Sequence, residues 1–197
     1  MIFEYMIKID LELGIYTRDL ILSYADDDHR CYEPTPYYVL EKLIESGYLT
    51  KDNILVDYGC CRGRVAFFLN YKIGCKIIGI ELIEKIYERA IKNLATYNYN
   101  IDNIEFKNID AMDFCVDEAD AFYFFNPFSK NILLPVLYNI FESYDKNPRY
   151  MKLFFYVAED GYEQVFSENS RLKLIHSIDV RSELKTNPRY AIKVFTI

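Results

Sequence analysis

The chain is predicted to form an α/β fold in which a mainly parallel sheet is covered by helices on both faces. Two observations support this fold. From residue 53 to residue 157, short β-rich runs alternate with helical patterns, and the first run enters a helix through a glycine turn. The last two β-rich runs follow one another with only a short turn between them, which permits antiparallel pairing alone. A length of 197 residues fits one such domain.

The N-terminal region differs from this pattern. Residues 1–30 are expected to form a helical extension, with one or two short helices interrupted at Gly14, and residues 31–197 the main domain. A further helix should begin at Thr35-Pro36, where a side-chain cap is followed by proline at the first helical position. Gly47 should end that helix.

The core of the main domain is expected to contain five strands that alternate with helices. The expected strands are residues 53–56, 76–80, 103–107, 119–125 and 152–157. Helices are expected at 64–71 and at 132–144, the second with Pro135 in its first turn. Another helix is indicated by apolar residues at helical spacing, namely Ile83, Ile86, Tyr87, Ala90, Ile91 and Leu94. Two final strands, 171–180 and 190–197, should pair around a turn at Asn187-Pro188.

The composition makes several classes of function less plausible. The net charge of −7, with 23 basic against 30 acidic residues, argues against a nucleic-acid partner, which requires a positive surface. Five cysteines, an odd number, do not indicate a disulfide framework, and a reducing cytoplasm is expected. With only two histidines and no Cys-x-x-Cys pair, we expect no metal site. No apolar run is long enough to cross a membrane.

The first chemical motif lies where the first strand turns into a helix. Residues 56–64 read Val-Asp-Tyr-Gly-Cys-Cys-Arg-Gly-Arg. In open parallel sheets, ligands bind at this carboxyl-end crevice. The glycines allow close approach of the backbone, and the helix N-terminus offers free N–H groups to a carboxylate. The spacing matches neither the Gly-x-Gly-x-x-Gly fingerprint nor a phosphate loop, which disfavours a nicotinamide dinucleotide.

Acidic residues follow the next two strands. Glu81 ends the second strand, where a carboxylate can accept both hydroxyl hydrogen bonds of a ribose, although it could instead be a solvated loop acid. Asp110 and Ala111 follow the third strand, where the acid can bind an adenine amino group and Met112 can pack on the ring. Asp110 could equally cap a short turn.

The fourth strand ends in Asn126-Pro127-Phe128, which places an amide, a rigid turn and an aromatic ring at the same edge. The alternative is a plain strand-ending turn with a hydrophobic plug. With the three preceding motifs, in this order, residues 32–157 resemble the class I S-adenosylmethionine-dependent methyltransferases. The resemblance implies a Rossmann-like three-layer sandwich with a seven-strand sheet whose last strand is antiparallel.

The resemblance also implies roles for individual residues. Residues 57–63 correspond to the family's methionine-binding turn, Glu81 to its ribose-binding acid, and Asp110-Ala111 to its adenine site. The candidate ligands of the cofactor S-adenosyl-L-methionine are therefore Asp57, Tyr58, Gly59, Cys60, Gly63, Glu81, Leu82, Asp110, Ala111 and Asn126, with Tyr37 closing over the sulfonium. The candidate catalytic residues are Asn126, which would orient a nitrogen nucleophile, Pro127, whose carbonyl is a second acceptor, and Phe128, a wall.

Two departures from the family pattern bear on activity. Cys61 occupies a position where the family usually has glycine, and the Asn-Pro-Phe turn lacks the second proline of the Asn/Asp-Pro-Pro-aromatic motif. The target atom therefore stays open. The expected function is methyl transfer, with a nitrogen of a protein or small molecule favoured over nucleic acid as the acceptor. The alternatives are a catalytically inactive cofactor-binding module and, less favoured, an NAD-dependent oxidoreductase.

Overall fold

The computed structural model describes residues 2–18, 28, 33–158, 160–181 and 190–197. Within them, the helices are α1 (Ile2–Leu13), α2 (Tyr37–Glu45), α3 (Arg64–Ile73), α4 (Glu84–Thr96), α5 (Lys130–Lys146) and α6 (Asp160–Glu168). The strands are β1 (Ile54–Tyr58), β2 (Lys76–Glu81), β3 (Ile104–Asn108), β4 (Ala121–Phe124), β5 (Lys152–Tyr156), β6 (Lys173–Asp179) and β7 (Ala191–Thr196).

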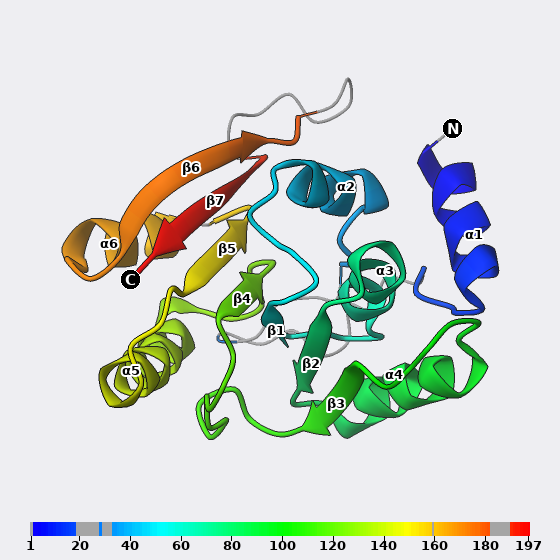
Figure 1. Ribbon diagram of the computed structural model, residues 1–197, viewed down its shortest axis with the longest axis horizontal. Coiled ribbons are helices and arrows are strands. Elements are labelled where there is room, and N and C mark those ends of the chain that lie inside the picture. Colours follow the sequence, from blue (N-terminus) through cyan, green and yellow to red (C-terminus); the bar gives the residue numbers. More distant parts are fainter. Residues whose placement is uncertain (1, 19–27, 29–32, 159, 182–189) are drawn as a thin grey trace.

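The strands form one sheet in the order β3-β2-β1-β4-β5-β7-β6 (Figure 1). The strands from β1 to β5 pair in parallel, and β7 runs antiparallel to both of its neighbours, β5 and β6. The predicted mainly parallel seven-strand sheet with an antiparallel last strand is confirmed. The predicted turn at Asn187-Pro188 lies outside the described residues.

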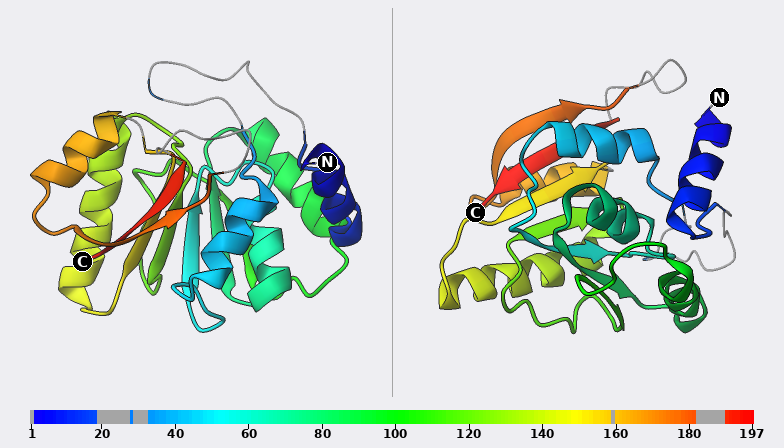
Figure 2. Two further views of the ribbon diagram at one scale, coloured as in Figure 1. Left: turned by 90° about the horizontal axis from the view of Figure 1, so that it is seen from above. Right: turned by 45° about the vertical axis from the view of Figure 1, so that its right-hand side comes forward.

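Helices cover both faces of the sheet, which makes three layers. Figure 2 shows α5 and α6 on one side of the strands and α1 to α4 on the other. Strand side chains alternate between the two faces, as the pleat requires. In β1, Leu55 packs into the core under α2 and α3, while Val56 and Tyr58 pack into the core under α5. Asp57 therefore points to the α2–α3 side, one residue before the end of the strand.

The helices depart from the predictions in three places, two in where they begin and one in which residues are buried. The helix predicted to start at Thr35-Pro36 begins at Tyr37, with Pro36 as its N-cap and no side-chain cap hydrogen bond. Pro135 lies in the second turn of α5, inside the helix, and not in its first turn. The stripe on α4 has Asn93 buried and Ile91 exposed, because the Asn93 side chain bonds the carbonyl groups of Tyr16 and Arg62.

Helix α6 was not predicted, since its sequence lacks a clear apolar stripe. Its aromatic residues nevertheless reach the core: Tyr162 is buried, and its hydroxyl donates a hydrogen bond to the carbonyl of Phe128, 2.7 Å away. This contact joins α6 to the turn after β4. One contact that holds the helix in place is therefore made with a residue 34 positions earlier in the chain.

Helix α1 is part of the domain's packing. Ile9 and Leu13 belong to the same buried cluster as α2 and α3, and Gly14, at φ +73, ends the helix. The proposed boundary between residues 30 and 31 falls outside the described residues, as do His29 and Cys31. Among the described helices, none is long and apolar enough to cross a membrane. The four cysteines that the structure describes are free thiols.

Candidate functional site

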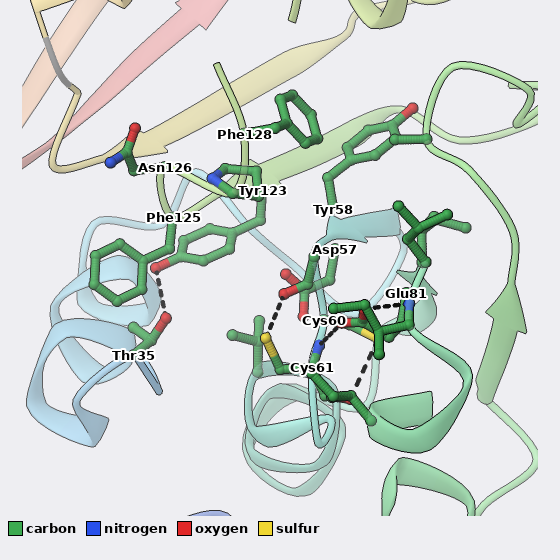
Figure 3. Close-up of a pocket in the computed structure, with 18 of the residues that line it drawn as sticks. Thr35, Asp57, Tyr58, Cys60, Cys61, Glu81, Tyr123, Phe125, Asn126 and Phe128 are labelled. Atoms are coloured by element: carbon green, nitrogen blue, oxygen red, sulfur yellow. Dashed lines mark hydrogen bonds between the residues drawn. The ribbon is translucent and has the colours of Figure 1, made fainter. Parts of the chain in front are cut away.

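The candidate site is a cavity at the carboxyl ends of β1, β2, β3 and β4. Its empty volume, including the open space at its mouth, is about 1040 Å³. The strand order reverses between β1 and β4, because the chain crosses from β3, at one side of the sheet, to β4 next to β1. Open α/β sheets bind ligands at this switch point. Figure 3 shows residues from the ends of β1, β2 and β4 converging on the cavity, together with Thr35 from the segment before α2.

The turn after β1 lies against both neighbouring strand ends. The N–H groups of Gly59 and Cys60 both donate to the carbonyl of Ile80, at 3.0 and 2.9 Å. Gly59 has φ +72, and a Cβ atom there would lie 2.7 Å from the Cβ of Pro127. Glycine is therefore required by the backbone conformation and by the close approach of the turn after β4. The first and fourth sequence motifs are in direct contact.

Gly63 and Cys61 have different roles in this turn. Gly63, at φ +84, precedes α3, and a Cβ atom there would lie 2.5 Å from the ring of Phe106. It is absent from the cavity lining. Its close contact with Phe106 is helix–strand packing, and its contact with a cofactor stays a prediction. Cys61 lines the cavity at φ +54, a left-handed conformation that disfavours any side chain with a Cβ.

Two buried carboxyl groups form the acidic floor of the cavity. Asp57 is 3% exposed, and its Oδ2 has no hydrogen-bond partner among the described residues. Burial, with a smaller contribution from the Glu81 charge, raises the pKa of Asp57 to about 8. Glu81 accepts hydrogen bonds from the N–H groups of Cys61 (3.1 Å) and Ile83 (2.9 Å). Burial raises the pKa of Glu81 despite these bonds.

The arrangement of these carboxyl groups favours a particular ligand chemistry. The hydrogen bonds from Cys61 and Ile83 each use one oxygen of Glu81, and an ionised carboxylate can accept about four in all. The Oδ2 of Asp57 has both of its lone pairs free. A buried acceptor without a donor is costly, so such a group is normally matched by a ligand or solvent. The floor is suited to a ligand with hydroxyl donors and a positive charge.

On the β3 side, Leu82, Asp110 and Ala111 line the cavity. The Oδ1 of Asp110 accepts a hydrogen bond from the N–H of Met112 at 2.8 Å, so the turn-capping role that the sequence left open is present. The other oxygen of Asp110 takes no part in that bond. Met112 is not among the residues that line the cavity, and its ring-packing role is not supported.

On the β4 side, Asn126, Pro127 and Phe128 line the cavity, as the sequence predicted. Asn126 has φ +44, and its Oδ1 is buried with no partner among the described residues. Figure 3 shows its side chain pointing away from the Asp57 and Glu81 pair. Phe128 packs edge-on against Tyr58 at 6.5 Å between ring centroids. The ring of Tyr58 thus points toward Phe128 and away from Asp57.

The structure does not bring Tyr37 to the cavity. Its side chain is fully buried, its ring lies 4.9 Å from that of Phe68, and its hydroxyl donates to Asp10. Helical spacing places it on the inward face of α2, and it does not line the cavity. The predicted contact with a sulfonium is corrected to a core position between α1 and α3.

Sequence reasoning missed several residues that line the cavity. These are Glu33, Pro34, Thr35, Arg64, Val65, Ile80, Ile83, Ile86, Ile109, Tyr123, Phe125 and Ile132, besides Cys61, which was noted only as a departure from the family. Tyr123 is the partner of Asp57 in the β1–β4 register, and its hydroxyl lies 3.3 Å from Thr35 Oγ1. A tyrosine in a strand that otherwise contains only alanine and phenylalanine could have indicated a residue that faces the site. No group of side chains within the described part of the chain could hold a metal ion.

Known proteins resemble this chain in sequence and in structure. No protein-family model matches it. It is 24% identical over 138 residues to a histone-lysine N-methyltransferase, H3 lysine-79 specific, of Dictyostelium discoideum. The matched region is 64% of this chain and 7% of that protein, so the chain spans a small part of the relative's length.

Solved structures share the architecture at low sequence identity. An RNA methyltransferase of Salinibacter ruber, in complex with S-adenosyl-L-homocysteine, superimposes with a TM-score of 0.60 at 17% identity. The match covers 83% of this chain and 92% of that one. The magnesium protoporphyrin IX methyltransferase of Synechocystis PCC 6803, with bound S-adenosylmethionine, gives 0.53 at 15% identity, over 80% and 74% of the two chains. The chain therefore has the fold of the class I S-adenosylmethionine-dependent methyltransferases.

Proposed function

We propose that the chain binds S-adenosyl-L-methionine and transfers its methyl group to a nitrogen atom of an acceptor. The observation that carries this proposal is the buried, unpartnered Oδ2 of Asp57 beside the Glu81 carboxylate. S-adenosylmethionine has an ammonium group, a sulfonium and a ribose diol. These are the positive charges and hydroxyl donors that the acidic floor lacks.

The strand order supports an orientation for the ligand. Along the sheet edge, Asp110 follows β3, Glu81 ends β2, Asp57 lies in β1 and Asn126 follows β4. By the family resemblance, adenine would lie near Asp110 and Ala111 with Leu82 beside it, and ribose at Glu81. The methionine part would lie at Asp57 with the turn of residues 58–60, and its reactive end would face Asn126.

In this proposal, the residues of the chain bind the cofactor and orient the acceptor. When bound, S-adenosylmethionine would supply an electrophilic methyl group on positively charged sulfur. The new nitrogen–carbon bond would form as the carbon–sulfur bond breaks, with S-adenosylhomocysteine as the leaving group and the proton of the nitrogen lost to solvent. The unpartnered Oδ1 of Asn126 accepts a hydrogen bond from that nitrogen and aims its lone pair. The carbonyl of Pro127 is a second acceptor. The rings of Phe125 and Phe128 exclude water from the reacting atoms.

Charge argues against the competing ligand and acceptor classes. The acidic residues that line the cavity are Glu33, Asp57, Glu81 and Asp110, and the only basic one among the described lining residues is Arg64. All three of the Arg64 nitrogens are hydrogen-bonded to the protein. Such a lining repels the pyrophosphate of NAD and a nucleic-acid backbone. A protein or small-molecule acceptor is therefore favoured.

Titration calorimetry at pH 7 with S-adenosylmethionine, S-adenosylhomocysteine and NAD tests the proposal. The first two ligands should bind and NAD should not. Because an ammonium group favours ionised Asp57, binding should release a proton, and the apparent enthalpy should change between buffers of different ionisation enthalpy. No heat and no thermal stabilisation at millimolar S-adenosylmethionine would reject the proposal.

A second experiment separates an enzyme from a catalytically inactive binding module. Cell extract is incubated with methyl-labelled S-adenosylmethionine and the purified protein, and labelled protein, nucleic acid and small molecules are resolved. Transfer to a protein or small molecule supports the proposal. Cofactor binding without any transfer would favour the binding module, and label in nucleic acid would contradict the proposed acceptor class.

A further inference from the structure

A buried polar network connects the N-terminal segment to the start of α3. Asp10, on α1, is fully buried and accepts hydrogen bonds from the N–H and the hydroxyl of Thr17, both at 2.9 Å. The same carboxylate accepts the hydroxyl of Tyr37 from α2. Thr17 Oγ1 in turn accepts the Nε–H of Arg64 at 2.7 Å. Three elements that are distant in sequence therefore meet at this network.

Arg64 is an unexpected residue at its position. It is the first residue of α3, where the helix dipole disfavours a positive charge. Its side chain is also buried, and a buried guanidinium destabilises a fold unless its donors are paired. Here the cost is offset by the carboxylate of Asp10, 4.0 Å away, and by hydrogen bonds to Thr17 and Thr35. This arrangement calls for an explanation beyond core packing.

The network ends at the cavity wall. The Nη1 of Arg64 donates to the carbonyl of Thr35 at 3.2 Å, and both residues line the cavity. The hydroxyl of Thr35 contacts that of Tyr123, the strand partner of Asp57 (Figure 3). Thr35 therefore lies on the β1–β4 side of the cavity, beyond Asp57 from Glu81. This is the end that the proposed function assigns to the methionine part of the ligand.

We infer that Asp10, Thr17 and Arg64 are positioning residues. They fix the cavity-lining segment at Thr35 where it contacts the methionine end of the ligand. The inference rests on the proposed function. Arg64 supports Thr35 and does not itself bind the ligand in this proposal, since each of its three nitrogens already donates to the protein. The N-terminal segment then contributes to ligand binding through Arg64, although Asp10 and Thr17 do not line the cavity.

Two ligands that differ at one end test this inference. S-adenosylhomocysteine contains the amino-acid part, whereas 5′-methylthioadenosine has the same adenosine and sulfur without it. Thr17→Val removes the hydroxyl at nearly constant volume and leaves the Nε–H of Arg64 unpaired. We expect its affinity for S-adenosylhomocysteine to fall about tenfold in calorimetry, while its affinity for 5′-methylthioadenosine stays within about twofold. Thr17→Ser, which keeps the hydroxyl, should restore wild-type binding.

Thr196→Val is the matched control. Thr196 is also buried and bonds a backbone carbonyl, that of Met151, but it lies on β7, outside the cavity lining. This variant should bind both ligands as the wild type does. If Thr17→Val fails to fold, Tyr37→Phe removes another hydrogen bond of Asp10 and should show the same ligand difference at a smaller size.

The outcomes separate the two hypotheses. Equal weakening of both ligands by Thr17→Val, or no weakening of either, overturns the positioning role and leaves the proposed function intact. Failure of the wild type to bind either ligand overturns the proposed function and this inference with it. A loss confined to S-adenosylhomocysteine, reversed by Thr17→Ser, supports the inference.

Discussion

The parallel strands of the sheet begin at one edge, the amino edge, and end at the other, the carboxyl edge. Both edges contain buried polar side chains, but these differ in how many have hydrogen-bond partners. At the amino edge, Asp120 accepts hydrogen bonds from Asn53 Nδ2 (3.0 Å) and from the N–H of Ile54 (2.9 Å). Arg149 donates twice to the carbonyl of Ala119, at 3.0 and 2.6 Å. These contacts join strand starts that are far apart in sequence. Each named side chain has a protein partner.

The carboxyl edge contains strain and unpaired groups. The three non-glycine residues at positive φ among the described residues, Cys61, Asn126 and Val157, follow β1, β4 and β5. Buried oxygens of Asp57 and Asn126 have no hydrogen-bond partner in the described part of the chain. Strained backbone and unsatisfied polar groups concentrate at ligand sites, where stability is given up for binding geometry. The amino edge stabilises the sheet, and the carboxyl edge is arranged for a ligand.

The largest expected effect concerns Asp57. Its folded-state pKa of about 8 exceeds the ordinary value of 3.8, so between those pH values the folded protein holds a proton that the unfolded chain has lost. The wild type therefore loses stability as pH rises from about 4 to about 8, and the loss is complete above that range. Asp57→Asn should be more stable than the wild type at pH 9 by about 3 kcal/mol or more, and similar to it at pH 4.

Urea unfolding at the two pH values measures this difference, and calorimetry should show weaker binding of S-adenosylmethionine by Asp57→Asn. Asp120→Asn at the amino edge is the control, because Asp120 is already paired and should show no gain. An equal stability difference at pH 4 and pH 9 would mean that Asp57 is not the titrating group.

The second prediction concerns Asn126. If its amide oxygen orients the acceptor nitrogen, Asn126→Ala should keep cofactor affinity within a few-fold and lower turnover about a hundredfold, the scale of one oriented catalytic group. The measurement is label transfer to the acceptor found in cell extract. Equal labelling by the variant and the wild type would leave Asn126 as a plain strand-ending turn residue.

The third prediction compares two carboxylates that each accept hydrogen bonds at both oxygens, Glu81 and Asp120. Glu81→Ala should lower the affinity for S-adenosylhomocysteine by at least about tenfold, because charge-assisted bonds to the ribose are lost. Asp120→Ala should lower the free energy of unfolding by about 1–3 kcal/mol and leave affinity unchanged. If both variants lose only stability, the two edges do not differ in function.

The smallest expected effect is at Cys61. Because its φ is +54, Cys61→Gly should raise the free energy of unfolding by about 1 kcal/mol and keep or improve cofactor affinity. Thermal denaturation and calorimetry measure the two quantities. Loss of binding in a folded variant would reveal a role for the thiol, whose Sγ lies 3.2 Å from the carbonyl of Gly59.

Local patterns in the sequence were sufficient to predict most of the architecture. The alternation of β-rich runs and helical stripes predicted all seven strands, because period and turn chemistry are properties of neighbouring residues. The motif positions Asp57, Glu81, Asp110 and Asn126 followed from the same logic, since the carboxyl ends of parallel strands meet at one edge. The sequence thus determined the order of the strands, the helices other than α6, and the ends of the strands that contain the site.

Tertiary contacts decided the rest. Gly59 packs against Pro127, Gly63 packs against Phe106, and the hydroxyl of Thr35 contacts that of Tyr123. These pairs are far apart in sequence, so no local pattern predicts them. The inward position of Tyr37 depends on Asp10, 27 residues earlier. Whether a polar side chain faces a cavity or a buried partner is set by packing between elements, because the same helix or strand position can satisfy either. Only the folded chain could therefore distinguish Asp57, whose Oδ2 lacks a partner, from Asp120, which has two.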